Sequence, residues 1–412
     1  MPRHPFLSRT VVTLCLALAA PLALADSLSL PQAIATALEH NPDLAAARQE
    51  IGIADGARRQ AGLIPNPELS YEVEDTRRNT STSTVSISQA LELGGKRGAR
   101  IEVASIGQNL AQMTLERQLN ALRAEVTEAF HAGLRAQAGV ELAQQSLELT
   151  ERGLRVVEGR VRAGKSSPVE ATRAQVQLAE ARLQLGRAET LKTTTWRQLA
   201  HVTGSSAGSF ERLQSPSLSP GLPPDAEPLL ARLEQTAELR QATAQIEQND
   251  AALGSEKAQR IPNLTVSLGS QYDRAERERV NVVGLSVPLP LFDRNQGNVL
   301  AAARRADQSR DLRNAVELRL RSETRSALNQ WATAMGEIEA YDRSILPAAR
   351  QAVDTATRGF EMGKFGFIEV LDAQRTLITA REQYLASLAS ASAARAQVER
   401  VYGDLGSATA TP

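Results

Sequence analysis

Two segments of this chain repeat the same switch from a strand pattern to a helix pattern. Residues 85–98 read Val-Ser-Ile-Ser-Gln-Ala-Leu-Glu-Leu-Gly-Gly-Lys-Arg-Gly, and residues 283–297 read Val-Gly-Leu-Ser-Val-Pro-Leu-Pro-Leu-Phe-Asp-Arg-Asn-Gln-Gly. In each, apolar residues alternate with small or polar ones until a turn rich in Gly, Pro or Asn ends the strand. The next proline is Pro168 in the first case and Pro347 in the second. The chain is therefore predicted to be a tandem duplication in which a short strand leads into one very long helix.

Each repeat is predicted to contain a helix, a β-hairpin, a long helix and a return helix. The first repeat is predicted at 26–204, with strands at about 67–75 and 83–91, and the second at 229–403, with strands at about 263–271 and 280–289. Polar tips at 76–84 and 271–279 join the strands of each hairpin. The Ser-, Gly- and Pro-rich stretch 205–228 is interpreted as the linker between the repeats, and 404–412 as a C-terminal tail.

The helices are expected to form long antiparallel pairs. A first pair of shorter helices at 29–39 and 42–62 has Asn41 as the N-cap of the second. The first long helix, at 98–158, would extend about 90 Å. Gly164 is expected to end it, and Pro168 to begin the return helix. That return helix carries two apolar stripes about 200° apart, so it is predicted to touch neighbours on two sides, as in a closed tube of helices.

Residues 1–25 are predicted to be a secretory signal peptide. A basic start precedes an apolar core at 11–24, and Ala23-Leu24-Ala25 suits cleavage after Ala25. A transmembrane anchor would need about 20 apolar residues, more than this run supplies. Cys15, the only cysteine, follows Leu14 rather than the small residue expected at a lipidation site. The mature chain then holds no thiolate metal site.

Charge and motifs argue against several functions. The 47 Lys and Arg residues balance the 47 Asp and Glu residues, so no basic surface for nucleic acid is expected. The four histidines, at 4, 40, 131 and 201, lack partners at metal-ligand spacing. Gly94-Gly95-Lys96 is interpreted as a strand-to-helix turn, because a phosphate loop would need glycine where Ala90 stands. No nucleophile stands beside a base, so neither an enzyme nor a cofactor is predicted.

The two hairpins are candidate membrane strands, and they require more than one copy of the chain. Four strands cannot close a barrel, and an open strand edge is not tolerated in lipid. Two copies would supply eight strands and three would supply twelve. The helices would then extend from the barrel as a second tube.

The duplication and the two segments 88–97 and 288–297 resemble the TolC-type outer membrane efflux proteins, and most closely their CzcC-like, heavy-metal branch. The resemblance covers essentially the whole mature chain. It implies a mainly α fold with a small antiparallel β part, and a homotrimer with a twelve-stranded outer membrane β-barrel continued by a periplasmic α-helical barrel. The implied partners are outer membrane lipid, a periplasmic membrane-fusion adaptor and an inner-membrane RND pump. The implied function is a passive duct that exports heavy-metal cations such as cobalt, zinc or cadmium.

The resemblance also implies roles for residues around two helix turns. The turns at 162–170 and 361–370 match the periplasmic tips that meet the adaptor, and Glu369 and Asp372 match acidic residues that line the constricted mouth of related channels. The alternative is that the glycines merely end helices and the carboxylates are solvated. Phe365 stands where some relatives carry a gate-locking arginine. The candidate docking residues are Gly164, Lys165, Glu170, Gly363, Lys364 and Phe365.

Two other functions stay open at this point. A duct for organic drugs or for a secreted protein would need the same architecture, since the branch-like segments are not substrate contacts. A soluble periplasmic coiled-coil scaffold would explain the helices, but it would leave the alternating hairpins without a purpose.

Overall fold

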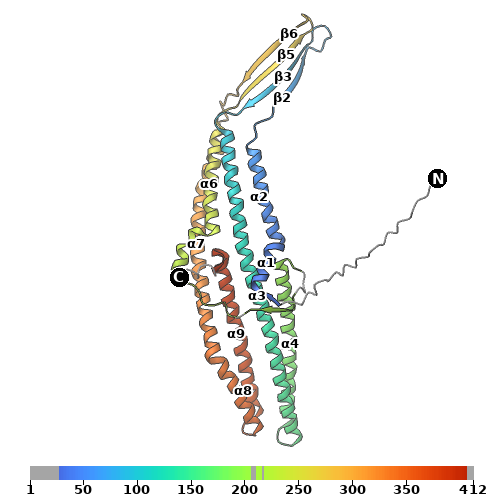
Figure 1. Ribbon diagram of the computed structural model, residues 1–412, viewed down its shortest axis with the longest axis vertical. Helices are drawn as coiled ribbons and strands as arrows, with labels where there is room; N and C mark the ends of the chain where they lie inside the picture. The colour runs from blue at the N-terminus through green and yellow to red at the C-terminus, as the bar shows by residue number, and fades with distance from the viewer. Residues whose placement is uncertain (1–26, 206–209, 216–217, 406–412) are drawn as a thin grey trace, which may run out of the picture.

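The computed structural model describes residues 27–205, 210–215 and 218–405. The molecule is a long rod (Figure 1). A β-sheet lies at one end, and the two loops that join α3 to α4 and α8 to α9 lie at the other. The predicted signal peptide, 1–25, and most of the predicted tail lie outside the described residues. The prediction of a mainly helical fold with a small antiparallel sheet is confirmed.

The first repeat begins with β1 (Ser27–Ser29), α1 (Leu30–His40) and α2 (Pro42–Ala61). A hairpin of β2 (Glu68–Glu74) and β3 (Thr82–Leu91) leads into α3 (Lys96–Arg162), and α4 (Pro168–Thr203) returns alongside it. Asn41 caps α2 as predicted: its Oδ1 accepts from the Leu44 N–H at 3.0 Å. Its Nδ2 donates to the Val202 carbonyl at 2.9 Å, which fastens α2 to the end of α4.

The second repeat follows β4 (Arg212–Gln214), α5 (Ala226–Ala231) and a short 3₁₀ turn (Leu233–Gln235). It consists of α6 (Ala237–Ala258), β5 (Leu264–Asp273), β6 (Glu278–Ser286), α7 (Gln296–Ala340), α8 (Leu346–Glu361) and α9 (Phe367–Tyr402). A π-helical turn, Tyr341–Ile345, joins α7 to α8. Pro347 follows it and cannot donate the N–H that a regular α-helix requires, so the wider turn lets one long helix continue past the proline.

Three boundaries differ from the sequence-based expectation. The last strand, expected at 280–289, is β6 at Glu278–Ser286, because Pro288 and Pro290 cannot donate to a ladder. The hairpin tips are shorter than expected, since Thr82–Thr84 already belong to β3, and Gln271–Asp273 and Glu278–Arg279 are paired in β5 and β6. The stretch 205–228 is not all linker: β4 pairs in parallel with β1, a pairing that the sequence analysis missed.

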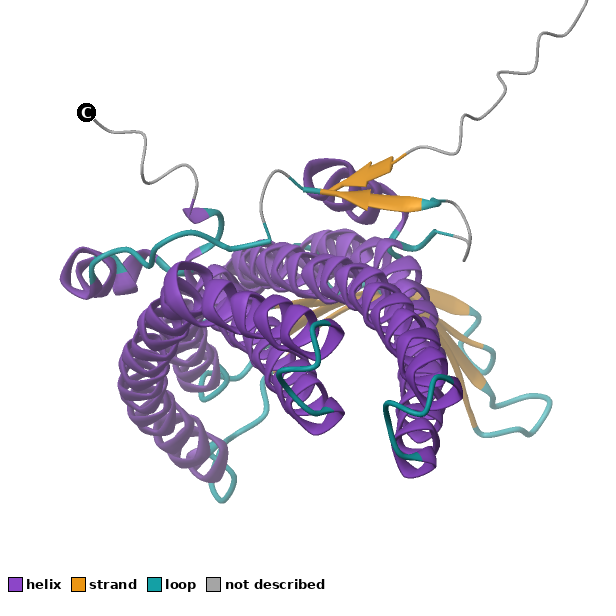
Figure 2. Cartoon of the chain, turned by 90° about the horizontal axis from the view of Figure 1, so that it is seen from below, coloured by secondary structure: helices purple, strands orange, loops and turns teal. Residues whose placement is uncertain are grey.

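The four hairpin strands form one antiparallel sheet in the order β2-β3-β5-β6. The two repeats therefore meet where β3 pairs with β5, and β2 and β6 are left as the edges. Below the sheet, the helices form a curved wall that is concave on one side, as seen along the long axis (Figure 2). In the described ranges, no helix combines the length and apolar composition needed to cross a bilayer.

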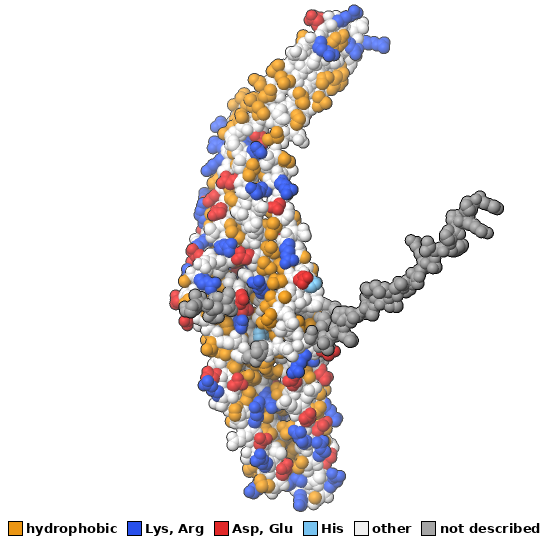
Figure 3. Space-filling model, viewed as in Figure 1, with side chains coloured by type: hydrophobic (Ala, Val, Ile, Leu, Met, Phe, Trp, Pro, Cys, Tyr) orange, Lys and Arg blue, Asp and Glu red, His pale blue; other side chains and the backbone are white. Residues whose placement is uncertain are grey.

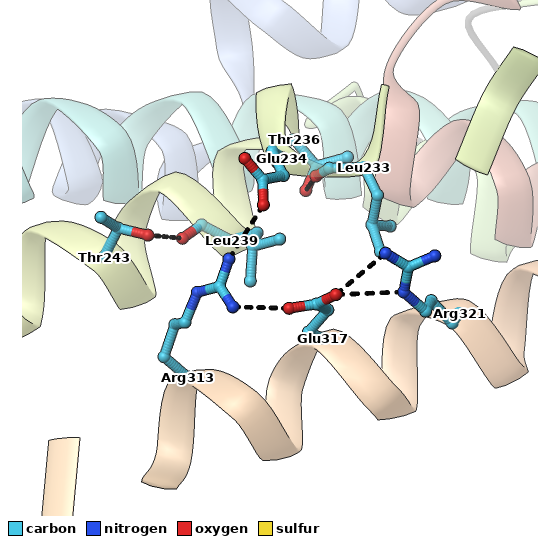
Figure 4. Close-up of polar contacts among 8 residues, drawn as sticks. All are labelled: Leu233, Glu234, Thr236, Leu239, Thr243, Arg313, Glu317 and Arg321. Carbon is cyan, nitrogen blue, oxygen red and sulfur yellow. Dashed lines mark hydrogen bonds and ion pairs between the residues drawn. The ribbon is translucent and has the colours of Figure 1, made fainter. Parts of the chain in front are cut away.

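The core is divided into clusters along the rod. One, around the fully buried Phe130, joins α1, α3 and α4, and another, around Trp331 and Leu388, joins α7 and α9. Ion pairs run along α7 and reach the 3₁₀ turn before α6: Arg313 contacts Glu317 at 2.5 Å and Glu234 at 3.1 Å, and Arg321 contacts Glu317 at 2.9 Å (Figure 4). Because these pairs remain in contact with solvent, each adds little to stability.

We expect the hairpin tips to tolerate insertions. Adding a Ser-Glu-Lys-Ser segment after Arg78 or after Ala275 would lengthen a loop that pairs with no strand, at a small entropic cost. Surface labelling of the insert in intact cells, with membrane assembly at the wild-type level, is the expected result. The same insertion after Ile87, inside β3, is the control, and it is expected to abolish assembly because it shifts the strand register.

Candidate functional site

The two turns at the helical end of the rod are built alike. In the first, the Lys165 N–H donates to the Arg160 carbonyl at 2.8 Å and the Gly164 N–H to the Val161 carbonyl at 2.9 Å. The equivalent bonds in the second run from Lys364 to Gly359 and from Gly363 to Phe360. Both are Schellman caps, with φ of +68° at Gly164 and +73° at Gly363. Each glycine therefore has a backbone role, and Lys165 and Lys364 are exposed at the apices.

Arg160 ties the two turns together, which the sequence analysis did not foresee. From α3 its Nη1 donates to the Phe360 carbonyl at the end of α8, at 2.8 Å, and its Nε donates to Ser166 Oγ at 3.2 Å. The guanidinium also lies 4.6 Å from the centroid of the Phe360 ring. Only the folded structure brings these residues together, since 200 positions separate Arg160 from Phe360.

Phe365 is packed within its own turn. A Cβ built on Gly359 would lie 2.1 Å from the Phe365 ring, so this ring rests directly on the backbone of α8. It still leaves 44% of its surface exposed. The two turns carry other exposed apolar side chains, namely Met362 and Ile368 in the second turn and Val169 in the first, which are 64%, 59% and 57% exposed. Apolar groups gathered at the end of a rod indicate a surface for another protein.

The acidic candidates differ in their surroundings. Glu369 and Asp372 are exposed on α9, on either side of the buried Val370. Neither has an ion-pair partner in the described part of the chain. Glu369 bends back so that its Oε2 would lie 2.9 Å from a Cβ built on Gly366. Glu170 is half-buried, and its Oε2 finds no hydrogen-bond partner among the described residues.

One face of the sheet carries an apolar band across all four strands, with the polar residues Asn281 and Arg279 of β6 nearer the tips. Because paired residues share a face, the register places Leu69, Ile87, Leu268 and Val283 in one row. These side chains are 74%, 50%, 54% and 70% exposed. Figure 3 shows apolar side chains gathered over the sheet, whereas charges are scattered along the helices. An exposed apolar band that crosses all four strands fits lipid.

The opposite face is mostly polar and carries the acidic residues of the four strands, with Val280 and Val282 of β6 as its large apolar exceptions. The row nearest the tips consists of Glu74, Thr82, Asp273 and Glu278, and Glu72 and Glu68 lie in the rows below. No Lys or Arg of the four strands lies on this face. The alternation is evident in the sequence, but these carboxylates become one surface only through the pairing of β3 with β5, which no local pattern predicts.

In the described ranges, the acidic row included, no group of three or more His, Cys, Asp or Glu side chains is arranged to hold a metal ion. His131 is buried in the contact between α3 and α9 and meets the Phe130 ring edge to face. Burial, together with the charges of Arg135 and Arg395, lowers its pKa to about 4.

His131 is expected to make the helices acid-labile. Its pKa falls from 6.5 in the unfolded chain to about 4 in the folded one, so the folded state binds fewer protons below pH 6.5. Stability is complete above that pH and declines by about 3 kcal/mol as the pH drops toward 4. Thermal unfolding in detergent at pH 7.5 and 4.5 measures the loss. In the His131→Leu variant, the difference between the unfolding temperatures at the two pH values is expected to be smaller than in the wild-type protein. A difference as large as that of the wild type would contradict this role of His131.

Residues 33–205 and 231–404 match the family described as outer membrane efflux protein, one match for each repeat. The chain belongs to this family. The efflux protein is 38% identical to the cobalt-zinc-cadmium resistance protein CzcC of Cupriavidus metallidurans over 383 residues, which cover 93% of this chain and 92% of CzcC. It is 30% identical to the nickel and cobalt resistance protein CnrC of the same organism, with 68% of each chain covered.

The fold agrees with solved channels. The structure of CusC matches with a TM-score of 0.75, 18% identity and 90% of each chain covered. VceC of Vibrio cholerae matches the efflux protein with a TM-score of 0.76 and 19% identity, over 91% of this chain and 96% of VceC. The predicted resemblance to TolC-type efflux proteins, and to their CzcC-like branch, is thereby confirmed.

Proposed function

We propose that this protein is the outer membrane channel of an RND-type tripartite efflux system, a passive duct for heavy-metal cations of the cobalt, zinc and cadmium kind. The observation that carries the proposal is the difference between the two faces of the sheet: one carries an exposed apolar band, and the other carries the carboxylates of the four strands. A strand pair with one face in lipid and one in water is what a membrane channel wall requires. The similarity to CzcC along most of the chain supports the choice of metal cations.

Three copies would complete the channel. The free edges β2 and β6 need partners in lipid, and each can find one in the other edge of a neighbouring copy. Three sheets would supply twelve strands, and three concave walls of helices would enclose a tube below them. The acidic rows would then face the lumen, where repeated carboxylates attract cations.

The helical end is the proposed docking surface for a periplasmic adaptor, which would connect the duct to an inner-membrane pump. The exposed side chains of both turns support this role: Lys165 and Lys364 at the apices, with Met362, Phe365 and Ile368 beside them. Gly164 and Gly363 would act indirectly, by shaping the turns, and Glu170 would lie beside the first. Glu369 and Asp372, one turn into α9, would form the acidic mouth.

The proposal is tested by deleting the gene in its host and measuring resistance to cobalt, zinc and cadmium salts together with resistance to organic drugs. Loss of metal resistance with unchanged drug resistance is expected, and plasmid-borne protein recovered in the outer membrane fraction is expected to restore it. The reverse pattern would assign the duct to drugs. Recovery in the soluble periplasmic fraction would identify a scaffold instead.

A trimer is expected in the membrane. Because the only cysteine, Cys15, lies in the predicted signal peptide, single cysteines can be placed freely in the rest of the chain. Substituting Leu69 or Val73 on β2, in combination with Val283 or Leu285 on β6, is expected to yield disulfide-linked species up to three chains for at least one pair. Cysteines at Leu69 and Ile87, which are paired within one chain, are the control and are expected to give monomers only.

A further inference from the structure

A short apolar segment follows β6 and extends the line of the apolar sheet face. Val287, Leu289 and Leu291 continue the two-residue spacing of the strand. Leu289, Leu291 and Phe292 are 76%, 64% and 91% exposed. The apolar segment 287–292 therefore presents more exposed hydrocarbon than most strand residues above it, at the level where the sheet meets the helices (Figure 1).

The backbone of this segment suits an apolar environment. Pairing of β6 with β5 ends at Ser286, so the residues that follow have no ladder. Pro288 and Pro290 carry no N–H, and the Leu291 N–H donates to the Leu289 carbonyl at 2.9 Å. Three of the six residues, Pro288, Pro290 and Leu291, therefore bring no unpaired N–H into lipid. The same prolines cannot complete a ladder with a strand of a second copy, which argues against that occupant.

Three exposed arginines lie at the same level. The Arg97 Nε donates to the Gly62 carbonyl at 2.7 Å, and an Arg294 Nη donates to the Leu291 carbonyl at 3.3 Å, within the apolar segment itself. Arg260 precedes Ile261, whose side chain would lie 2.7 Å from a Cβ built on Gly94, so α6 ends beside the start of α3. The described part of the chain shows no ion pair for any of these three guanidinium groups.

The nearby carboxylates are directed to other partners. Glu92 pairs with Arg100, and Glu256 Oε2 accepts from Asn295 Nδ2 at 2.6 Å. Asp293 Oδ1 accepts from the Asn295 N–H at 2.9 Å. Glu256 and Asp293 keep their charge, since Asn295 is neutral, but the three arginines without an ion pair outnumber these two carboxylates, so the charge next to the apolar segment is positive on balance.

We propose that the apolar segment 287–292, together with Arg97, Arg260 and Arg294, forms a seat for anionic phospholipids of the leaflet nearest the helices. Acyl chains pack against Leu289, Leu291 and Phe292, and the guanidinium groups bind the lipid phosphates. The arginine hydrogen bonds to Gly62 and Leu291 hold two of the guanidinium groups at the height of the phosphates. The proposal rests on the outer membrane function proposed above.

The test places a tryptophan in the segment and measures its quenching by brominated lipid. The F292W protein is reconstituted in vesicles of phosphatidylcholine and phosphatidylglycerol in which one lipid at a time carries bromine on its acyl chains. Wild-type emission, from Trp196 and Trp331, is subtracted. Y71W reports the apolar sheet face, and L222W, at a residue 81% exposed beside the helices, is the control away from lipid.

The fluorescence of F292W is expected to be quenched by both brominated lipids. The quenching constant is expected to be about fivefold larger for brominated phosphatidylglycerol than for brominated phosphatidylcholine. Adding R97Q, R260Q and R294Q is expected to bring that ratio close to one, whereas adding R155Q, R173Q and R187Q, which change exposed arginines of the long helices, leaves it unchanged. L222W stays unquenched.

Each other result contradicts a stated part of the proposal. If Y71W is quenched and F292W is not, the segment does not contact lipid, and the channel function stands. If neither is quenched, the membrane placement of the sheet itself is wrong. If both lipids quench F292W equally, the arginines do not select anionic headgroups.

Discussion

Replacing Gly363 or Gly164 by proline is expected to abolish metal resistance while the protein still assembles in the membrane. Proline fixes φ near −65°, whereas these residues have φ of +73° and +68°. Proline also removes an N–H that donates a hydrogen bond. The Gly363 N–H donates to the Phe360 carbonyl and the Gly164 N–H to the Val161 carbonyl, each at 2.9 Å. The turn must rearrange, and the exposed side chains of the proposed docking surface move with it. The sheet lies at the other end of the rod and is not affected.

The matched control is Gly366→Pro, three residues farther along the same turn. Gly366 has φ of −76°, a value that proline adopts, and a side chain there meets only the flexible carboxylate of Glu369. Metal resistance close to wild type is expected for this variant. Wild-type resistance in both Gly164→Pro and Gly363→Pro, with the protein at normal level, would exclude the turns as the docking surface.

Removing the charges of Glu369 and Asp372 together is expected to lower the preference of the channel for cations. The two residues are three positions apart on α9, and both are exposed and unpaired within the described chain. Threefold repetition would bring six carboxylates to a narrow mouth, where like charges reinforce one another's attraction for cations. In planar bilayers, the E369Q/D372N protein is expected to show a cation-to-anion permeability ratio several-fold below wild type and weaker block by divalent cations.

Two comparisons locate this effect. Glu382→Gln, farther along α9 and also exposed, is expected to leave selectivity unchanged. Neutralising the row Glu74, Asp273 and Glu278 on the sheet is expected to reduce selectivity without weakening block from the periplasmic side. Unchanged selectivity and block in E369Q/D372N would show that these two carboxylates are solvated on the outer wall of the tube.

The sequence predicted local features well. The Asn41 cap, the turn glycines and the two hairpins all follow from patterns within a few residues, and the structure shows each of them. The β1–β4 pairing was missed because a three-residue strand shows no periodicity. The Arg160–Phe360 bond and the acidic row were missed for another reason: each depends on contact between the two repeats, which no local pattern contains.

In the two Schellman caps, the backbone holds the turn in shape and the side chains form its exposed surface. The hydrogen bonds of the caps point inward and satisfy the backbone at each apex, so an approaching protein meets side chains rather than main chain. Those side chains, such as Met362 and Ile368, can change without altering a single bond of the cap. On the proposed docking surface, the choice of adaptor could therefore diverge between duplicated genes while the helices stay the same, and a transplanted apex is expected to carry that choice into a related channel.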